Sequence, residues 1–189
     1  MADFKEAFKL TMGHEGEYSF DPDDAGGETY RGISRRYHPN WEGWIVIDGR
    51  NKNIEKIKKL NLNSYVMEFY KEYYWNKFLG NEILSQNIAD EMFDTSVNLG
   101  IEKSVIFLQE ALNYLNRNEL LYPDLVVDGV IGNNTMNALD AYLQKDKEVY
   151  LLKIMNILQG MHYLNFMKKS PTQEKYCRGW LNRVEISKI

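Results

Sequence analysis

A stretch rich in glycine and acidic residues, residues 14–33, sets the strongest limit on how this chain can fold. It contains four glycines and has no Lys or Arg before Arg31. Its six carboxylates are Glu15, Glu17, Asp21, Asp23, Asp24 and Glu28. So many like charges repel one another unless they are solvated, bound to a cation or held apart for chemistry. The stretch is therefore expected to be a tightly turned loop, in which glycine lets the backbone approach a ligand closely.

The segment before this loop predicts an amphipathic helix over residues 2–14, because apolar residues recur there at spacings of three and four. Glu15 continues the apolar face, and Gly16 follows at the position that a C-cap glycine prefers. Burial and the negative end of the helix dipole both raise the pKa of a carboxyl group in such a place. Glu15 is therefore a candidate general acid. A merely solvated acidic loop is the alternative that composition alone favours.

A calcium loop is the main competing interpretation of this acidic segment. Counting from Asp21, Asp23 and Gly26 match an EF-hand loop. The fifth position is Ala25 and the twelfth is Gly32, so the bidentate ligand is missing. We therefore expect neither a metal site nor a cofactor.

An ordered set of chemically unlike residues runs through the loop, Glu15-Gly16-x-Tyr18-x-x-Asp21-Pro22-x-Asp24-x-Gly26-Gly27-x-Thr29-x-x-Gly32-Ile33. This set resembles glycoside hydrolase family 108, the lysozyme-like N-acetylmuramidases. Two positions depart from the family pattern. Glu17 stands where Gly is usual, and Ala25 where Pro is frequent. Glu17 puts an extra negative charge beside the expected acid, which raises the pKa of that acid further if both lie in one cleft.

The resemblance implies a peptidoglycan hydrolase that cleaves the β-1,4 bond between N-acetylmuramic acid and N-acetylglucosamine. In this interpretation Glu15 protonates the glycosidic oxygen. A loop carboxylate, Asp24 before Asp21, orients water or stabilises the oxocarbenium-like transition state, and Thr29 positions that water. The residues expected to bind the sugar are Tyr18, Glu28, Tyr30 and Trp41.

The rest of the chain is predicted to be mainly helical, and the only candidate strand is Trp44–Ile47. The helix over residues 64–79 is aromatic nearly all round and is expected in the middle of the domain. For Trp41, ordinary packing remains an open alternative to sugar stacking. Helices are expected over residues 54–60, 64–79, 86–99, 104–115, 135–143, 148–168 and 172–184.

Two later segments also resemble family 108, whose C-terminal part is described as a predicted peptidoglycan-binding region. They are Leu108-Gln109 with Asp128-Gly129-x-Ile131-Gly132-x-x-Thr135-x-x-Ala138-Leu139, and Gly179-Trp180-x-Asn182-Arg183. Asn133 stands where Pro is usual, and simple turn chemistry is the alternative for the Asp-Gly pair. The expected fold is mainly α, a lysozyme-like two-lobed helical domain with a Gly/Asp-rich active-site loop and little or no β. We expect a catalytic lobe over residues 1–98, with a helical, predicted peptidoglycan-binding lobe over residues 99–189 packed on it.

Composition adds limits on partners and location. The net charge of −4 disfavours nucleic-acid binding, and no apolar run predicts membrane insertion. Charges interrupt the N-terminal segment, so no signal peptide is expected, and the single Cys177 is compatible with a reducing cytosol.

A wall hydrolase without a signal peptide implies synthesis in the cytoplasm and release by a separate holin, by lysis or by another export route. We expect a bacterial or prophage endolysin that is monomeric and binds peptidoglycan glycan strands. The alternative is a catalytically inactive peptidoglycan-binding or secretion-assisting protein on the same fold.

Overall fold

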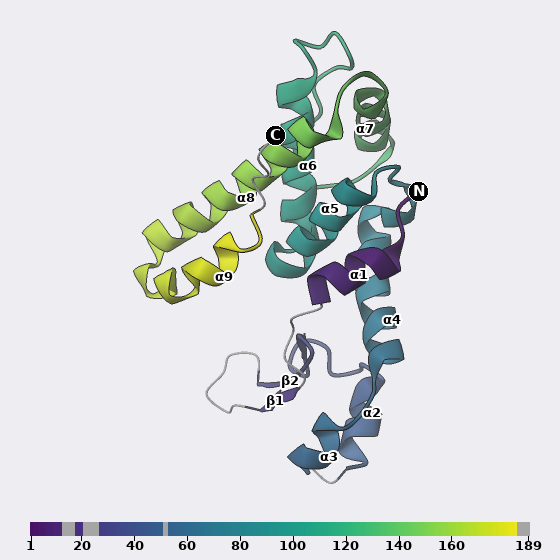
Figure 1. The fold of residues 1–189 in the computed structure, drawn as a ribbon, viewed down its shortest axis with the longest axis vertical. Coiled ribbons are helices and arrows are strands. Elements are labelled where there is room, and N and C mark those ends of the chain that lie inside the picture. Colours follow the sequence, from purple (N-terminus) through teal and green to yellow (C-terminus); the bar gives the residue numbers. More distant parts are fainter. Residues whose placement is uncertain (13–17, 21–26, 51–52, 185–189) are drawn as a thin grey trace.

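The computed structural model describes residues 1–12, 18–20, 27–50 and 53–184. Most of them are helical, and one small sheet lies below α1 in Figure 1. The α-helices are α1 Phe4–Met12, α2 Gly43–Asp48, α3 Ile54–Lys58, α4 Asn63–Tyr73, α5 Gln86–Leu99, α6 Ile101–Leu115, α7 Asn133–Lys145, α8 Glu148–Lys169 and α9 Cys177–Leu181. The 3-10 helices are η1 Trp75–Phe78, η2 Gly80–Glu82 and η3 Pro171–Tyr176, and the strands are β1 Tyr18–Phe20, β2 Glu28–Tyr30 and β3 Ile33–Ser34.

The regularly amphipathic segments form the expected helices. α5 begins and ends where the sequence predicts, and its N-cap Ser85 accepts a hydrogen bond from the Ile88 amide. Gly100, at φ 89°, then turns the chain directly into α6, a conformation that glycine adopts without strain. α8 matches its predicted range to within one residue.

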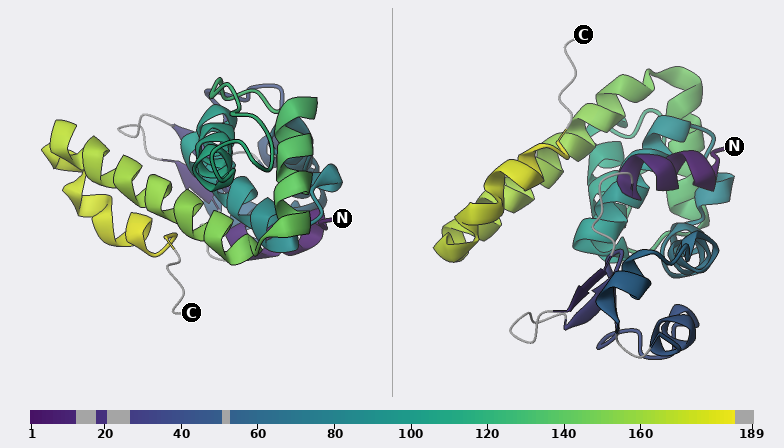
Figure 2. Two further views of the ribbon diagram at one scale, coloured as in Figure 1. Left: turned by 90° about the horizontal axis from the view of Figure 1, so that it is seen from above. Right: turned by 60° about the horizontal axis from the view of Figure 1, so that its bottom comes forward.

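A single buried cluster runs from α1 through α4, α5, α6 and α7 to α8. Helix α5 lies at its centre and packs on α1, α6 and α8. The outer half of α8, with α9 beside it, extends away from this body as an arm (Figures 1 and 2). Because the cluster crosses residue 98, the division into lobes at that point stays a prediction. In the described part of the chain, no helix is both long and apolar enough to cross a membrane.

The prediction of one helix over residues 64–79 is wrong. Helix α4 ends at Tyr73 and a 3-10 turn, η1, follows it. The fully buried Trp75 ring covers Gly80 so closely that a Cβ added there would lie 2.4 Å from the ring. Leu79 takes a φ of 58° to allow this approach. Burial of Trp75 therefore decides where the regular helix stops.

The prediction of a strand at residues 44–47 is also wrong, because these residues form part of α2. Trp44 and Ile47, three residues apart, both face the core, as a helix allows. The Trp44 indole N–H donates to the His38 carbonyl oxygen at 2.8 Å. Packing and this hydrogen bond outweigh the strand propensity of the Ile-Val-Ile run.

The sheet is antiparallel with the order β1-β2-β3, and none of its strands was predicted individually. Tyr30 pairs with Ile33, so Arg31 and Gly32 form a two-residue hairpin turn with φ values of 45° and 79°. Two positive φ values are typical of a type I′ turn, which suits strand twist. Tyr30 and Ile33 are buried and attach the sheet to the core. The small size of the sheet agrees with the predicted fold class, which is mainly α with little β.

Candidate active site

Strands β1 and β2 hold the described part of the predicted site. Tyr18 of β1 pairs with Tyr30 of β2, and Ser19 with Thr29. The Tyr18 hydroxyl donates to Glu28 Oε1 at 2.9 Å. Burial, together with the hydrogen bond and negative charge of Glu28, raises the pKa of Tyr18 to about 12, so the hydroxyl stays protonated as a donor at neutral pH.

Glu28 also pairs with Arg35, which follows β3. The Arg35 guanidinium donates to both Asp48 oxygens, at 2.8 and 3.0 Å, and lies 4.3 Å from the centre of the Trp44 ring. Both Glu28 oxygens are thus already engaged, by Tyr18 and by Arg35. This network connects the sheet to α2 and fixes the position of β2.

The other predicted residues of the sheet and of the following loop differ in exposure. Thr29 is half-buried, and its hydroxyl donates to the Gly27 carbonyl oxygen at 3.2 Å. Tyr30 is only 4% exposed and donates to the Leu60 carbonyl oxygen at 3.0 Å. Trp41 is half-buried, covers Gly43 and donates to the Tyr65 carbonyl oxygen at 3.2 Å. Sugar contacts by these residues stay predictions.

The predicted catalytic carboxylates Glu15, Asp21 and Asp24 lie outside the described residues, as does Glu17. In sequence, described residues stand on both sides of them. α1 ends three residues before Glu15, and β1 and β2 flank residues 21–26.

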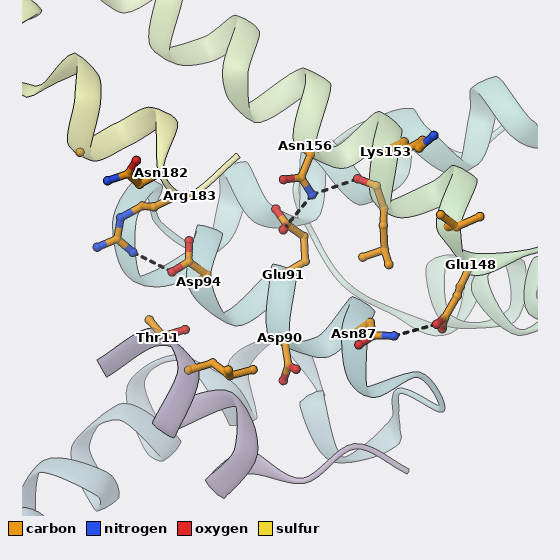
Figure 3. Close-up of a pocket in the computed structure, with 14 residues that line it drawn as sticks. Thr11, Asn87, Asp90, Glu91, Asp94, Glu148, Lys153, Asn156, Asn182 and Arg183 are labelled. Atoms are coloured by element: carbon orange, nitrogen blue, oxygen red, sulfur yellow. Dashed lines mark hydrogen bonds and ion pairs between the residues drawn. The ribbon is translucent and has the colours of Figure 1, made fainter. Parts of the chain in front are cut away.

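A polar groove of about 890 Å³ lies between α1, α5, α8 and the end of α9 (Figure 3). Leu10 and Thr11, at the end of α1, form one of its walls. Sequence reasoning missed this groove, although Asn182 and Arg183 belong to the C-terminal family pattern. The charged and amide side chains lining it are Asn87, Asp90, Glu91, Asp94, Glu148, Lys153, Asn156, Asn182 and Arg183.

Side chains from helices distant in sequence join across the groove. Arg183 pairs with Asp94 at 2.7 Å, and Asn156 donates to Glu91 Oε2 at 2.9 Å. Asp90 accepts a hydrogen bond from Gln86 at 2.7 Å, and burial raises its pKa. No group of three or more His, Cys, Asp or Glu within the described residues is arranged to hold a metal ion. The groove offers hydrogen-bonding groups of the kind that bind sugar hydroxyl and acetamido groups.

A second cavity, of about 850 Å³, lies beside the loop before α7. Gln109 of α6, 1% exposed, holds this loop together. Its side-chain amide donates to Asp128 and Thr135, and its oxygen accepts from the Asp128 and Gly129 amides. The structure thus joins Gln109 to Asp128, Gly129 and Thr135 of the same family-like segment, and these polar groups mainly shape the loop.

Glu28→Gln tests whether the sheet network is chiefly structural. The change keeps an acceptor for Tyr18 but removes the charge that pairs with Arg35. Because the pair is partly exposed, we expect the free energy of unfolding to fall by about 1–2 kcal/mol. The melting temperature should fall by roughly 2–6 °C, as measured by circular dichroism. Glu68→Gln, at an exposed position of α4, is the matched control. Unchanged stability combined with weaker binding of glycan oligosaccharides would instead place Glu28 in direct contact with sugar.

The fold has a counterpart among solved structures. The structure of Brucella abortus SagA matches with a TM-score of 0.62 and 24% sequence identity, over 96% of this chain and 88% of that chain. At this identity the likeness concerns the fold alone. No curated protein matches the chain.

Two family models match the chain, one after the other. The glycosyl hydrolase 108 model matches residues 8–100, which include α1, the acidic loop, the sheet and α5. The predicted peptidoglycan domain model matches residues 103–185, which include the second sequence pattern and the α8–α9 arm. The chain therefore belongs to glycoside hydrolase family 108, with the mainly helical, lysozyme-like fold expected of a peptidoglycan hydrolase.

Proposed function

We propose that this protein cleaves the β-1,4 bond between N-acetylmuramic acid and N-acetylglucosamine in peptidoglycan. One observation carries the proposal. The glycosyl hydrolase match begins in α1, and the end of that helix lines a polar groove. The other walls of the groove come from α5, α8 and α9, so segments of both family matches contribute to it.

Glu15 is the proposed general acid. Leu10 and Thr11 line the groove, and Glu15 follows the last residue of α1 by three positions. From Thr11 to Glu15 the chain advances four residues and spans at most about 14 Å between Cα atoms, which limits how far Glu15 can lie from the groove. The negative end of the α1 dipole raises the pKa of a carboxyl group nearby and favours its protonated form. A protonated carboxyl is what protonation of the glycosidic oxygen requires.

Asp24, before Asp21, is the proposed second carboxylate. Both belong to the segment that joins β1 to β2, and the bonds of Glu28 fix the β2 side of that segment. A carboxylate there orients water or stabilises the oxocarbenium-like transition state, and Thr29 positions the water.

Tyr18, Glu28, Tyr30 and Trp41 are the proposed sugar-binding residues. Phe20, which sequence reasoning passed over, joins this group because its side chain is 58% exposed at the end of β1, next to Asp21. An exposed aromatic face provides a stacking surface for the apolar face of a pyranose ring.

The route to the wall follows from the same proposal. An endolysin made in the cytoplasm reaches peptidoglycan through a separate holin, through lysis or through another export route. We propose that the protein works as a monomer, since the groove is lined by segments of both family matches and all of these segments belong to one chain.

Digestion of purified peptidoglycan, followed by mass analysis of the new reducing ends, tests the function. We expect muramic acid at every new reducing end. Glucosamine there would identify a different glycosidase. Binding to peptidoglycan without any new reducing ends would favour a catalytically inactive binding protein.

A further inference from the structure

Helix α8 carries an exposed apolar stripe along its outer side. Its members are spaced alternately by four and three residues, the spacing that keeps side chains on one helix face. Tyr150, Ile157, Met161 and Leu164 are 42%, 47%, 52% and 50% exposed, and Ile154 between them is half-buried. The stripe is about 21 Å long, at 1.5 Å per residue.

The fold buries this stripe only in part, at Ile154, which packs against the edge of the core. The buried residues of α8 lie on the opposite side, where the helix packs on α5 and α6. Helix α9 also packs on this buried side of α8, since Trp180 of α9 stacks on Tyr163 of α8 with ring centres 5.3 Å apart. Figures 1 and 2 show the segment that holds η3 and α9 along one side of the outer half of α8, and both elements contact the helix. Both sides of α8 are thus apolar, but only one faces the core. The buried residues are Leu151, Met155, Asn156, Gln159, Tyr163 and Met167.

Positive charge surrounds the stripe. At 100° per residue, Lys153, Lys168 and Lys169 lie within about 100° of its centre, and Lys147 directly precedes the helix. Glu148, the only acidic residue of α8, points to the other side, where it accepts hydrogen bonds from Ser85 and Asn87. Residues 147–184 hold seven Lys or Arg and two Asp or Glu, a net charge of +5 in a chain whose net charge is −4. The segment from α8 to α9 is therefore basic and the rest of the chain is acidic.

We propose that the α8 stripe docks on the surface of an anionic phospholipid bilayer. A helix that combines a row of large apolar side chains with flanking lysines lies in the plane of such a surface, with the apolar row below the headgroups. Anionic lipids attract the lysines, while the apolar row distinguishes a bilayer from a soluble polyanion, which offers no hydrocarbon.

A second copy of the chain fits this surface less well. Two stripes placed face to face would bring two sets of lysines together, and like charges repel. Five side chains also fall well short of the roughly 20–30 residues per partner of a standard protein interface. The observations therefore favour lipid.

Docking by the stripe leaves the catalytic groove open. Of the α8 residues that line the groove, Glu148, Leu152 and Asn156 lie on the side of the helix opposite the stripe. Lys153 also lines the groove and is the one that flanks the stripe. A molecule held at the bilayer in this way presents its groove away from the lipid, toward the wall. Docking at a bilayer is separate from the proposed hydrolysis, because a bilayer neither supplies nor consumes the glycan.

Co-sedimentation of the full chain with lipid vesicles tests the proposal. The vesicles contain either phosphatidylcholine alone or phosphatidylcholine with about one third phosphatidylglycerol. We expect binding to the anionic vesicles, at least about tenfold weaker binding to the neutral ones, and loss of binding at high salt.

Two pairs of substitutions separate the apolar and the charged contributions. Ile157→Gln with Met161→Gln should weaken binding to anionic vesicles by at least about tenfold, since each removes buried hydrocarbon. Ile45→Gln, at a 76% exposed position on α2, should leave it unchanged. Lys168→Gln with Lys169→Gln should weaken binding by roughly tenfold or more. Lys56→Gln with Lys58→Gln, exposed on α3, is the matched control.

Three outcomes would overturn the proposal. They are equal binding to both kinds of vesicle, no binding to either, and a dimer in analytical ultracentrifugation that Ile157→Gln with Met161→Gln dissociates. Circular dichroism confirms that each variant is folded. Hydrolysis of soluble glycan fragments should not change in any of these variants, so a failed vesicle test leaves the proposed hydrolase function intact.

Discussion

Glu15→Gln is expected to lower the rate of peptidoglycan hydrolysis by about a thousandfold, because a positioned general acid typically contributes about 10²–10⁴-fold. Gln has nearly the same shape as Glu but carries no transferable proton. The melting temperature should therefore stay within about 2 °C of the parent. Release of reducing ends from purified walls measures the rate, and calorimetry measures stability.

Glu82→Gln provides the control for the Glu15 experiment. Glu82 is an exposed residue of η2, and removing its charge should change neither rate nor stability. If the Glu15→Gln variant hydrolyses walls at the parental rate, Glu15 is structural and the proposed mechanism is wrong. A variant that loses activity only because it unfolds would show a lowered melting temperature.

Asp24→Asn is expected to lower turnover by about 10²–10³-fold, with a much smaller effect from Asp23→Asn. A carboxylate that orients water or stabilises positive charge on the sugar loses both abilities as an amide. Asp23 is the matched control, since it is adjacent and chemically identical. Asp21→Asn should have an intermediate effect if Asp21 only assists.

Initial rates on purified peptidoglycan, with peptidoglycan binding measured separately, decide between these carboxylates. Equal and small effects at Asp21, Asp23 and Asp24 would support a merely solvated loop. A large effect at Asp21 alone would move the second role from Asp24 to Asp21.

Hydrophobic periodicity predicted most of the long helices well. α5, α6 and α7 each bury one face, so the apolar spacing in the sequence reflects the spacing in the structure. The same reasoning failed for α4, because aromatic residues surround that segment and leave no face to identify. There the fit of Trp75 over Gly80 sets the boundary.

The short sheet escaped prediction for a related reason. Strands of two or three residues are too short to show alternation. They form because Tyr30 and Ile33 are buried and because Arg31 and Gly32 make a tight turn. The run Trp44–Ile47 was predicted to be a strand and is helical, because burial of two side chains on one helix face outweighs its strand propensity.

The sequence by itself determined the helical class of the fold, the family and the residues proposed to carry the chemistry, because these depend on local periodicity and on an ordered motif. Only the tertiary structure placed Asp94 beside Arg183 and Glu91 beside Asn156, pairs separated by 89 and 65 residues. It also decided which apolar side of α8 is buried, since both sides look alike in sequence. Such contacts arise from the packing of whole helices against one another, and no local pattern encodes them.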